Sequence, residues 1–153
     1  MLTSAFSDAL ITIARRLHAA RINWAVIGST SLVLLGMDAQ PNDIDIIMLR
    51  KDLNRIPALF SDVFCTGVIE LKTTTKEKAW HVKLSLAGAP IEFVGEDETG
   101  LYARHLALNE IAFGYVDAVR IPCLTLEANA QAYDATNRTL KAERIRDFIR
   151  TKE

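Results

Sequence analysis

Apolar residues recur every three or four positions in several parts of the chain, and this spacing predicts amphipathic helices. The clearest run covers residues 4–20, with Ser4 or Ser7 as its expected N-cap. A second helix is predicted after Gly28, with its first turn capped by the run Ser29-Thr30-Ser31. Further helices are predicted, in chain order, over residues 51–60, 102–113, 125–135 and 139–151.

Shorter apolar or alternating runs lie between these helices and predict strands. Residues 80–86 alternate strictly, and a turn at Gly88-Ala89 joins them to residues 90–94 as a predicted hairpin. The other predicted strands cover residues 24–27, 43–49 and 119–121. Helices mixed with pairing strands predict one α/β (α+β) domain over residues 1–153, with a mixed twisted sheet and helices packed around it.

The charge balance narrows the set of partners. Half of the 153 residues are hydrophobic, and the formal net charge is -1. This near-neutral balance gives no general attraction to nucleic acid or to an anionic membrane. The one basic run is short, comprising Lys72, Lys76, Lys78 and Lys83. No duplex nucleic acid is therefore expected as a partner.

The cysteines and the N-terminus indicate the compartment. Cys65 and Cys123 lie far apart among apolar neighbours, so they are expected to be buried reduced thiols rather than a disulfide or metal site. The first residues lack the basic region of a signal peptide. The longest apolar run, around residues 32–35, is far shorter than the roughly 20 residues of a membrane span. A cytoplasmic protein without a membrane partner is expected.

Asp43 and Asp45 are the leading candidates for chemistry. Two residues apart on a strand, they point to one side with Cα atoms about 6–7 Å apart. Their mutual repulsion calls for a partner, and a divalent cation is one. The same pattern also fits a strand whose polar face is solvated.

The turn at Gly28-Ser29 is the second candidate. It ends a predicted strand and begins a helix, where glycine allows close backbone approach and helix amides favour anions. On its own, this turn fits a simple helix cap as well as it fits an anion-binding turn. Its position about fifteen residues before the two aspartates makes the combination specific.

These residues together resemble the signature of the DNA polymerase beta nucleotidyltransferase superfamily. That signature is a hydrophobic strand, Gly-Gly or Gly-Ser, a helix, and Asp-hydrophobic-Asp; residues 26–29 and 42–47 match it. The most similar members are small bacterial nucleotidyltransferases, including antibiotic-modifying enzymes and the nucleotidyltransferase halves of toxin–antitoxin pairs. The resemblance is strong over residues 22–49 and looser beyond.

The resemblance implies a polymerase beta-like fold and an assignment of roles. Asp43 and Asp45 would hold two Mg²⁺ (or Mn²⁺) ions with a nucleoside triphosphate, ATP being the first expectation, and Gly28 and Ser29 would cradle its phosphates. Glu92, where most relatives carry aspartate, would be the third carboxylate and help to deprotonate the attacking hydroxyl. A hydroxyl of a small molecule or protein would then attack the α-phosphate and release pyrophosphate.

The C-terminal part extends this resemblance with one difference. Lys141 lies where a basic residue can reach the triphosphate, although it also fits a solvated helical position. Gln40 and Tyr133 stand where many relatives carry basic residues. This loss leaves an alternative open: a weakly active or inactive protein that binds a partner, for example the antitoxin of a toxin–antitoxin pair.

Other polar residues near these motifs have less defined expectations. His81 and Lys83 lie on the polar side of the strand next to Glu92, where they either face the cleft or are solvated. The acidic run 96–98 is expected to be a solvated loop, and His18 and His105 have no partner pattern.

Overall fold

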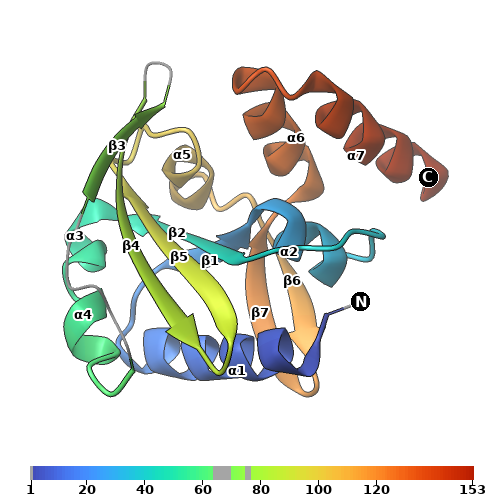
Figure 1. Ribbon diagram of the computed structural model, residues 1–153. Helices are drawn as coiled ribbons and strands as arrows, with labels where there is room; N and C mark the ends of the chain where they lie inside the picture. The colour runs from blue at the N-terminus through green and yellow to red at the C-terminus, as the bar shows by residue number, and fades with distance from the viewer. Residues whose placement is uncertain (1, 64–69, 75–76) are drawn as a thin grey trace.

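The computed structural model describes residues 2–63, 70–74 and 77–153, and its centre is a seven-stranded mixed sheet (Figure 1). The spatial order of the strands is β3-β4-β5-β2-β1-β7-β6. Their bounds are β1 Trp24–Ile27, β2 Ile44–Leu49, β3 Glu70–Thr74, β4 Glu77–Leu86, β5 Ala89–Glu96, β6 Ile111–Val116 and β7 Val119–Leu124.

The directions of the central strands bring distant parts of the chain into register. Strand β2 runs parallel to β5 and antiparallel to β1, and β1 runs parallel to β7. The β3–β4, β4–β5 and β6–β7 pairs are antiparallel. Between β4 and β5, Ala87 and Gly88 both have positive φ angles, as a two-residue hairpin turn of the primed type requires.

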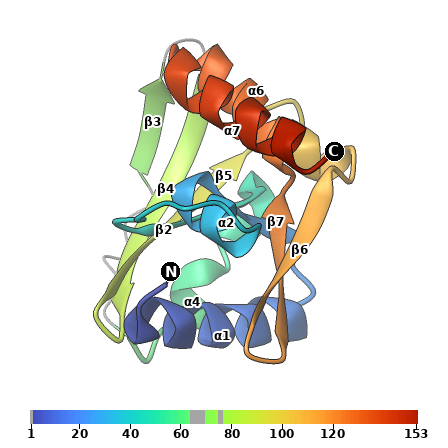
Figure 2. The same cartoon turned by 90° about the vertical axis from the view of Figure 1, so that its right-hand side faces the viewer.

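Helices cover both faces of this sheet (Figures 1 and 2). Helix α1 and the short helices α3 and α4 pack on the larger core, whereas α5 and the start of α6 pack on the opposite face. The bounds are α1 Ser4–Ala19, α2 Gly28–Leu34, α3 Arg50–Leu53, α4 Ile56–Leu59, α5 Ala103–Ala107, α6 Leu126–Ala135 and α7 Thr139–Thr151.

The alternation of β2 decides which residues reach each face. Ile44, Ile46 and Met48 are buried in the α1 core, whereas Ile47 lies in the opposite core with α5 and α6. Asp45 shares the side of Ile47 because side chains alternate along a strand. Strand β2 thus buries one face completely and presents the candidate carboxylate, Asp45, on the other face.

The predicted fold class, a mixed α/β sheet with helices around it, is confirmed. Several elements match closely, but α1 is capped by Thr3, whose hydroxyl accepts the Phe6 N–H, and not by Ser4 or Ser7. Cys123 is buried and free, as expected, while Cys65 lies outside the described residues. In the described part of the chain, no helix is both long and apolar enough to cross a membrane.

Two predicted helices differ from the structure, and strands β3 and β6 were not predicted. The helix expected over residues 102–113 ends at Ala107, because Asn109 adopts a left-handed backbone conformation (φ 54°), and β6 follows from Ile111. The helix expected over residues 51–60 is divided into α3 and α4. Strand β3 was not predicted; it pairs with β4 at one edge of the sheet.

Candidate active site

Three carboxylates converge at one end of the central strands. Asp45 on β2 is the direct cross-strand neighbour of Glu92 on the parallel strand β5, and Asp43 immediately precedes β2. Each of the three residues offers a carboxylate oxygen within 4.8 Å of the others. The structure therefore brings together the carboxylates that the sequence analysis singled out.

These carboxylates line a cleft of about 410 Å³. Its lining includes Asp43, Asp45 and Glu92 at the sheet, which we call the carboxylate side, and Tyr102 and Arg138 from the segments that follow β5 and α6. The three acids are partly buried. Partly buried carboxylates this close repel one another, so the site favours a cationic partner.

Gly28 lies directly beside Asp45. Its φ angle is +69°, in the left-handed region where a side chain causes strain, and a Cβ atom there would lie 3.6 Å from Asp45 Oδ2. The glycine is thus required by backbone conformation, and it forms part of the wall around the carboxylate.

Asn129 on α6 holds this turn in place, a role that no motif in the sequence indicates. The Gly28 N–H donates to Asn129 Oδ1 at 3.1 Å, and Asn129 Nδ2 donates to Ser31 Oγ at 3.1 Å. The same Nδ2 lies 3.2 Å from Leu124 O and 3.1 Å from Thr125 O. Because its amide already has a partner, Gly28 contributes shape here, not a free donor.

The hydroxyls after Gly28 hold the turn from within α2. Thr30 Oγ1 donates to the backbone oxygen of Asp43 at 2.7 Å, and Ser31 Oγ donates to Gly28 O at 2.6 Å. The predicted side-chain cap by Ser29, Thr30 or Ser31 is wrong, since the N-cap is Ile27 without a capping side chain. The hydroxyls instead connect the glycine turn to the start of β2.

Two basic residues on β4 approach Glu92. His81 Nδ1 is in hydrogen-bond contact with Glu92 Oε1, and Lys83 Nζ lies 3.9 Å from Oε2. The His81 side chain is 13% exposed, whereas that of Lys83 is 59% exposed. His81 therefore faces the cleft, and the solvated interpretation applies only to Lys83.

Two cations, Arg138 in the lining of the cleft and Lys141 in the adjoining pocket, stack on the Tyr133 ring, and we call them the cationic side. The Arg138 guanidinium lies 4.9 Å from the centre of the Tyr133 ring, and Lys141 Nζ lies 5.5 Å from it. Lys141 and Ser29 line a neighbouring pocket of about 330 Å³ together with Tyr133 and Arg144. Thus, although Tyr133 stands where relatives carry a basic residue, it has two cations beside it.

Tyr102 and Glu96 complete the cleft. Glu96 is buried, and its Oε1 accepts the N–H groups of Tyr102 and Ala103 at 2.8 and 2.9 Å, so the expectation of a solvated acidic loop is wrong for this residue. Burial raises the pKa of Tyr102 to about 12. The Tyr102 hydroxyl therefore stays protonated and is a hydrogen-bond donor at neutral pH.

The donor set fits a divalent cation. Asp43, Asp45 and Glu92 offer only carboxylate oxygens, the ligands that Mg²⁺ and Mn²⁺ prefer, and they leave room for phosphate oxygens in the cleft. Such a cation would neutralise the negative charge of these three side chains.

Comparison with known proteins agrees with this geometry. The sequence model of the aminoglycoside-2''-adenylyltransferase family matches residues 9–147, which is most of the chain. The chain belongs to this nucleotidyltransferase family. The resemblance to polymerase beta-type nucleotidyltransferases, read from residues 22–49, is thereby confirmed.

Solved structures show the same fold. A candidate nucleotidyltransferase from Thermotoga maritima is 26% identical, with a TM-score of 0.77 over 99% of this chain and 96% of that one. The antibiotic-resistance factor ANT(2'')-Ia is 9% identical with a TM-score of 0.56, covering 99% of this chain and 94% of its own. A nucleotidyltransferase-like protein from Paracoccidioides brasiliensis is 12% identical, with a TM-score of 0.56 over 92% of this chain and 76% of its own. No curated protein sequence matches significantly.

Proposed function

We propose that this protein transfers a nucleoside monophosphate from a nucleoside triphosphate, with ATP as the first expectation, to a hydroxyl acceptor and releases pyrophosphate. The observation that carries the proposal is the cluster of Asp43, Asp45 and Glu92 beside Gly28, in a chain that belongs to a nucleotidyltransferase family. Transfer would follow the two-metal mechanism, in which paired divalent cations neutralise charge on the phosphates and on the attacking and leaving oxygens.

Each side chain has a distinct task in this proposal. Asp43 and Asp45 would supply oxygen ligands to the cations, Asp45 from β2, which is fixed between β1 and β5, and Asp43 from the position just before that strand. Glu92 accepts the proton of the acceptor hydroxyl as its oxygen bonds to the α-phosphorus and the bond to pyrophosphate breaks. Such a positioned base contributes about 10²–10⁴-fold to a rate.

The cationic side of the cleft supports triphosphate binding. Arg138 lines the acidic cleft, and Lys141 lines the adjoining pocket with Ser29. We propose that these two cations contact the phosphate groups and that Ser29 completes the cradle beside Gly28. Stacking on Tyr133 restrains both cations, which lowers the entropy lost when they bind phosphate.

The acceptor proposed first is an aminoglycoside. The family that matches is named for adenylyl transfer to this class, and one structure of ANT(2'')-Ia is a complex with adenylyl-2''-tobramycin. In this chain the cleft contains four acidic side chains, Asp43, Asp45, Glu92 and Glu96. Three of these acids are assigned to the cations and Glu96 is bound to backbone N–H groups, so the choice of an aminoglycoside acceptor rests on the family match.

The antitoxin alternative depended on missing basic residues at Gln40 and Tyr133. Arg138 and Lys141 both lie beside the Tyr133 ring and supply positive charge at that position. A binding protein without turnover therefore remains only as an outcome of the experiment, and no protein partner is assigned.

The test is direct measurement of transfer. The protein is incubated with Mg²⁺, each of the four nucleoside triphosphates and tobramycin, while pyrophosphate is measured and the acceptor is examined by mass spectrometry. We expect pyrophosphate release together with an acceptor heavier by one nucleotidyl group. Inositol, a polyol without amines, is the matched acceptor control. Release of no pyrophosphate with any nucleotide or metal would favour the binding-protein alternative.

A further inference from the structure

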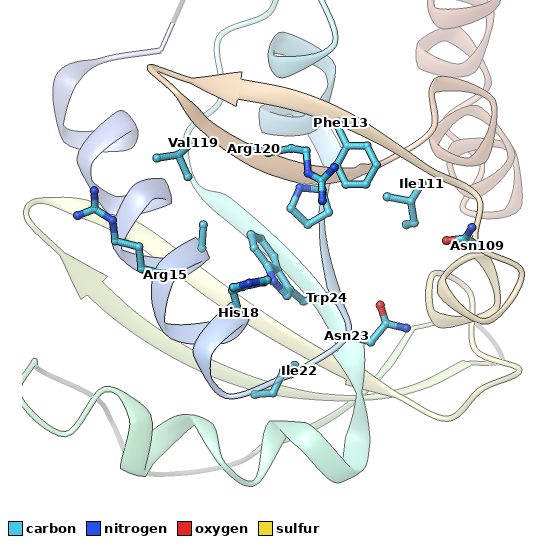
Figure 3. Close-up of a pocket in the computed structure, with 12 residues that line it drawn as sticks. Arg15, His18, Ile22, Asn23, Trp24, Asn109, Ile111, Phe113, Val119 and Arg120 are labelled. Carbon is cyan, nitrogen blue, oxygen red and sulfur yellow. The ribbon is translucent and has the colours of Figure 1, made fainter.

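A second cavity lies away from the acidic cleft. It has a volume of about 440 Å³ and is enclosed by α1, the segment Ile22–Trp24 and the β6–β7 hairpin (Figure 3). We call it the hairpin pocket. Trp24 begins β1 and Gly28 follows its end, so the two sites are separated by the length of this strand, about 13 Å at 3.3 Å per residue. None of the residues lining the acidic cleft also lines this pocket.

The hairpin pocket combines apolar and basic side chains. Its apolar lining includes Phe113, which is 46% exposed, Pro122, and the largely buried Trp24. The Arg120 guanidinium lies 4.3 Å from the centre of the Phe113 ring, which adds a planar cation to the same wall. Such surfaces suit a planar ligand, and the volume falls within the usual range of small-molecule sites.

The charge of the hairpin pocket has one sign. Among the described residues that line it, the charged ones are Arg15 and Arg120, His18 is a further basic side chain, and none is an aspartate or glutamate. Within residues 2–63, 70–74 and 77–153, no carboxylate forms an ion pair with Arg15 or Arg120. Figure 3 shows His18 beside the Trp24 indole and Arg120 against Phe113. Positive charge next to an apolar base favours a ligand that has both an anionic group and an apolar body.

We propose that the hairpin pocket binds a small planar molecule with an anionic group, such as an aromatic carboxylate. The planar body would lie against the exposed side chains of the hairpin, next to the edge of the buried Trp24, and the anionic group would lie toward Arg120. This site is independent of nucleotide transfer, because it uses neither the carboxylates nor the cations of the acidic cleft.

The test uses the full chain and the probe 2-naphthoate, followed by ¹H–¹⁵N nuclear magnetic resonance. We expect saturable shifts of the Trp24 indole N–H and of hairpin amides; the variant Trp80→Phe identifies which indole signal belongs to Trp24. The neutral probe 2-naphthamide has the same shape and should bind roughly fivefold or more weakly, since it lacks the charge. Rising salt should reduce this difference.

Two arginine variants test whether Arg120 contacts the anionic group of the probe. Arg120→Ala should weaken 2-naphthoate binding about three- to tenfold, whereas Arg150→Ala on α7 should leave it unchanged. Both arginines are exposed, and circular dichroism verifies that each variant folds. Equal affinity for the two probes, equal affinity of wild type and Arg120→Ala, shifts centred on Asp45, or no saturable shift would each overturn the proposal.

Discussion

The two sides of the acidic cleft are built differently. Asp45 and Glu92 lie on neighbouring central strands in direct register, and Asp43 is held through its backbone by Thr30. Arg138 and Lys141, in contrast, are exposed side chains at the start of the C-terminal helix, restrained by stacking on Tyr133. One side is fixed by the sheet; the other can adjust.

This difference separates two kinds of task. Metal coordination and proton transfer need side chains held to within about 0.5 Å, which strands provide better than loops. Recognition of a flexible triphosphate tolerates movement, and exposed arginine and lysine suit it. Substitution of the base Glu92 should therefore lower kcat, loss of Asp43 and Asp45 should remove the Mg²⁺ dependence of nucleotide binding, and substitutions on the cationic side should raise KM for the nucleotide.

The largest effect is expected at Glu92. Glu92→Gln keeps the shape of the side chain but removes the base, so kcat for transfer should fall by about 10²–10⁴-fold with little change in nucleotide affinity. Steady-state kinetics with tobramycin measures both quantities. Glu98→Gln, an exposed acid just beyond β5, is the matched control and should behave as wild type. A normal kcat in Glu92→Gln would exclude its role as the base.

Asn129 on α6 is hydrogen-bonded to the Gly28 turn, so its substitution should lower the stability of the fold. Asn129→Ala would leave the Gly28 N–H and its neighbours without buried partners, at a cost of about 2–3 kcal/mol in the free energy of unfolding. Urea denaturation measures this cost. Gln131→Ala, an exposed position on the same helix, should cost less than about 0.5 kcal/mol. Equal stability of the two variants would contradict the positioning of Gly28 by Asn129.

Arg138 tests the cationic side. Arg138→Ala removes a charge that we expect to contact phosphate, so KM for the nucleotide should rise about 10- to 100-fold while kcat changes little. Arg150→Ala, which removes an arginine far along α7, is the control. If kcat fell instead, the division of tasks between the two sides would be wrong.

His81 and Lys83 form a matched pair on one strand. Both approach Glu92, but only His81 is in hydrogen-bond contact with it. His81→Ala should lower kcat by about three- to tenfold because Glu92 loses a restraining partner. Lys83→Ala, whose side chain is mostly solvated, should change kcat less than twofold. Equal effects of the two substitutions would mean that the contact does not position Glu92.

The smallest expected effect is a loss of stability at alkaline pH. Burial raises the pKa of Cys123 from 9.0 to about 12, and that of Tyr102 from 10.0 to about 12. Groups with a raised folded-state pKa stabilise the fold fully below their unfolded pKa values, so stability should fall as pH rises from 9 toward 12. The Cys123 thiol should lower the free energy of unfolding by about 1.4 kcal/mol at pH 10 relative to neutral pH. Urea denaturation of Cys123→Ala across this range should show a weaker decline; an identical decline would exclude the thiol.

The sequence predicted much of the carboxylate side. Asp43 and Asp45 were recognisable from strand alternation and local spacing, and Gly28 because a tight turn demands glycine. Glu92 was expected only because the family resemblance implies a third carboxylate on a later strand. Asn129 could not be predicted, since its partners at Gly28 and Ser31 lie about a hundred residues away along the chain. Arg138 was missed because its place in the cleft depends on how the C-terminal helices pack. Strand β6 was missed because a left-handed Asn109 divides an apolar run that fits helical spacing.

The most direct test of the central claim is calorimetric titration of ATP into the protein with and without Mg²⁺. Wild type should bind ATP in a Mg²⁺-dependent manner, and the double variant Asp43→Asn/Asp45→Asn should lose that dependence. Circular dichroism confirms that the variant is folded, and Asp117→Asn, in an exposed turn, is the control. Mg²⁺-dependent binding of equal affinity in wild type and in the double variant would contradict the assignment of these aspartates.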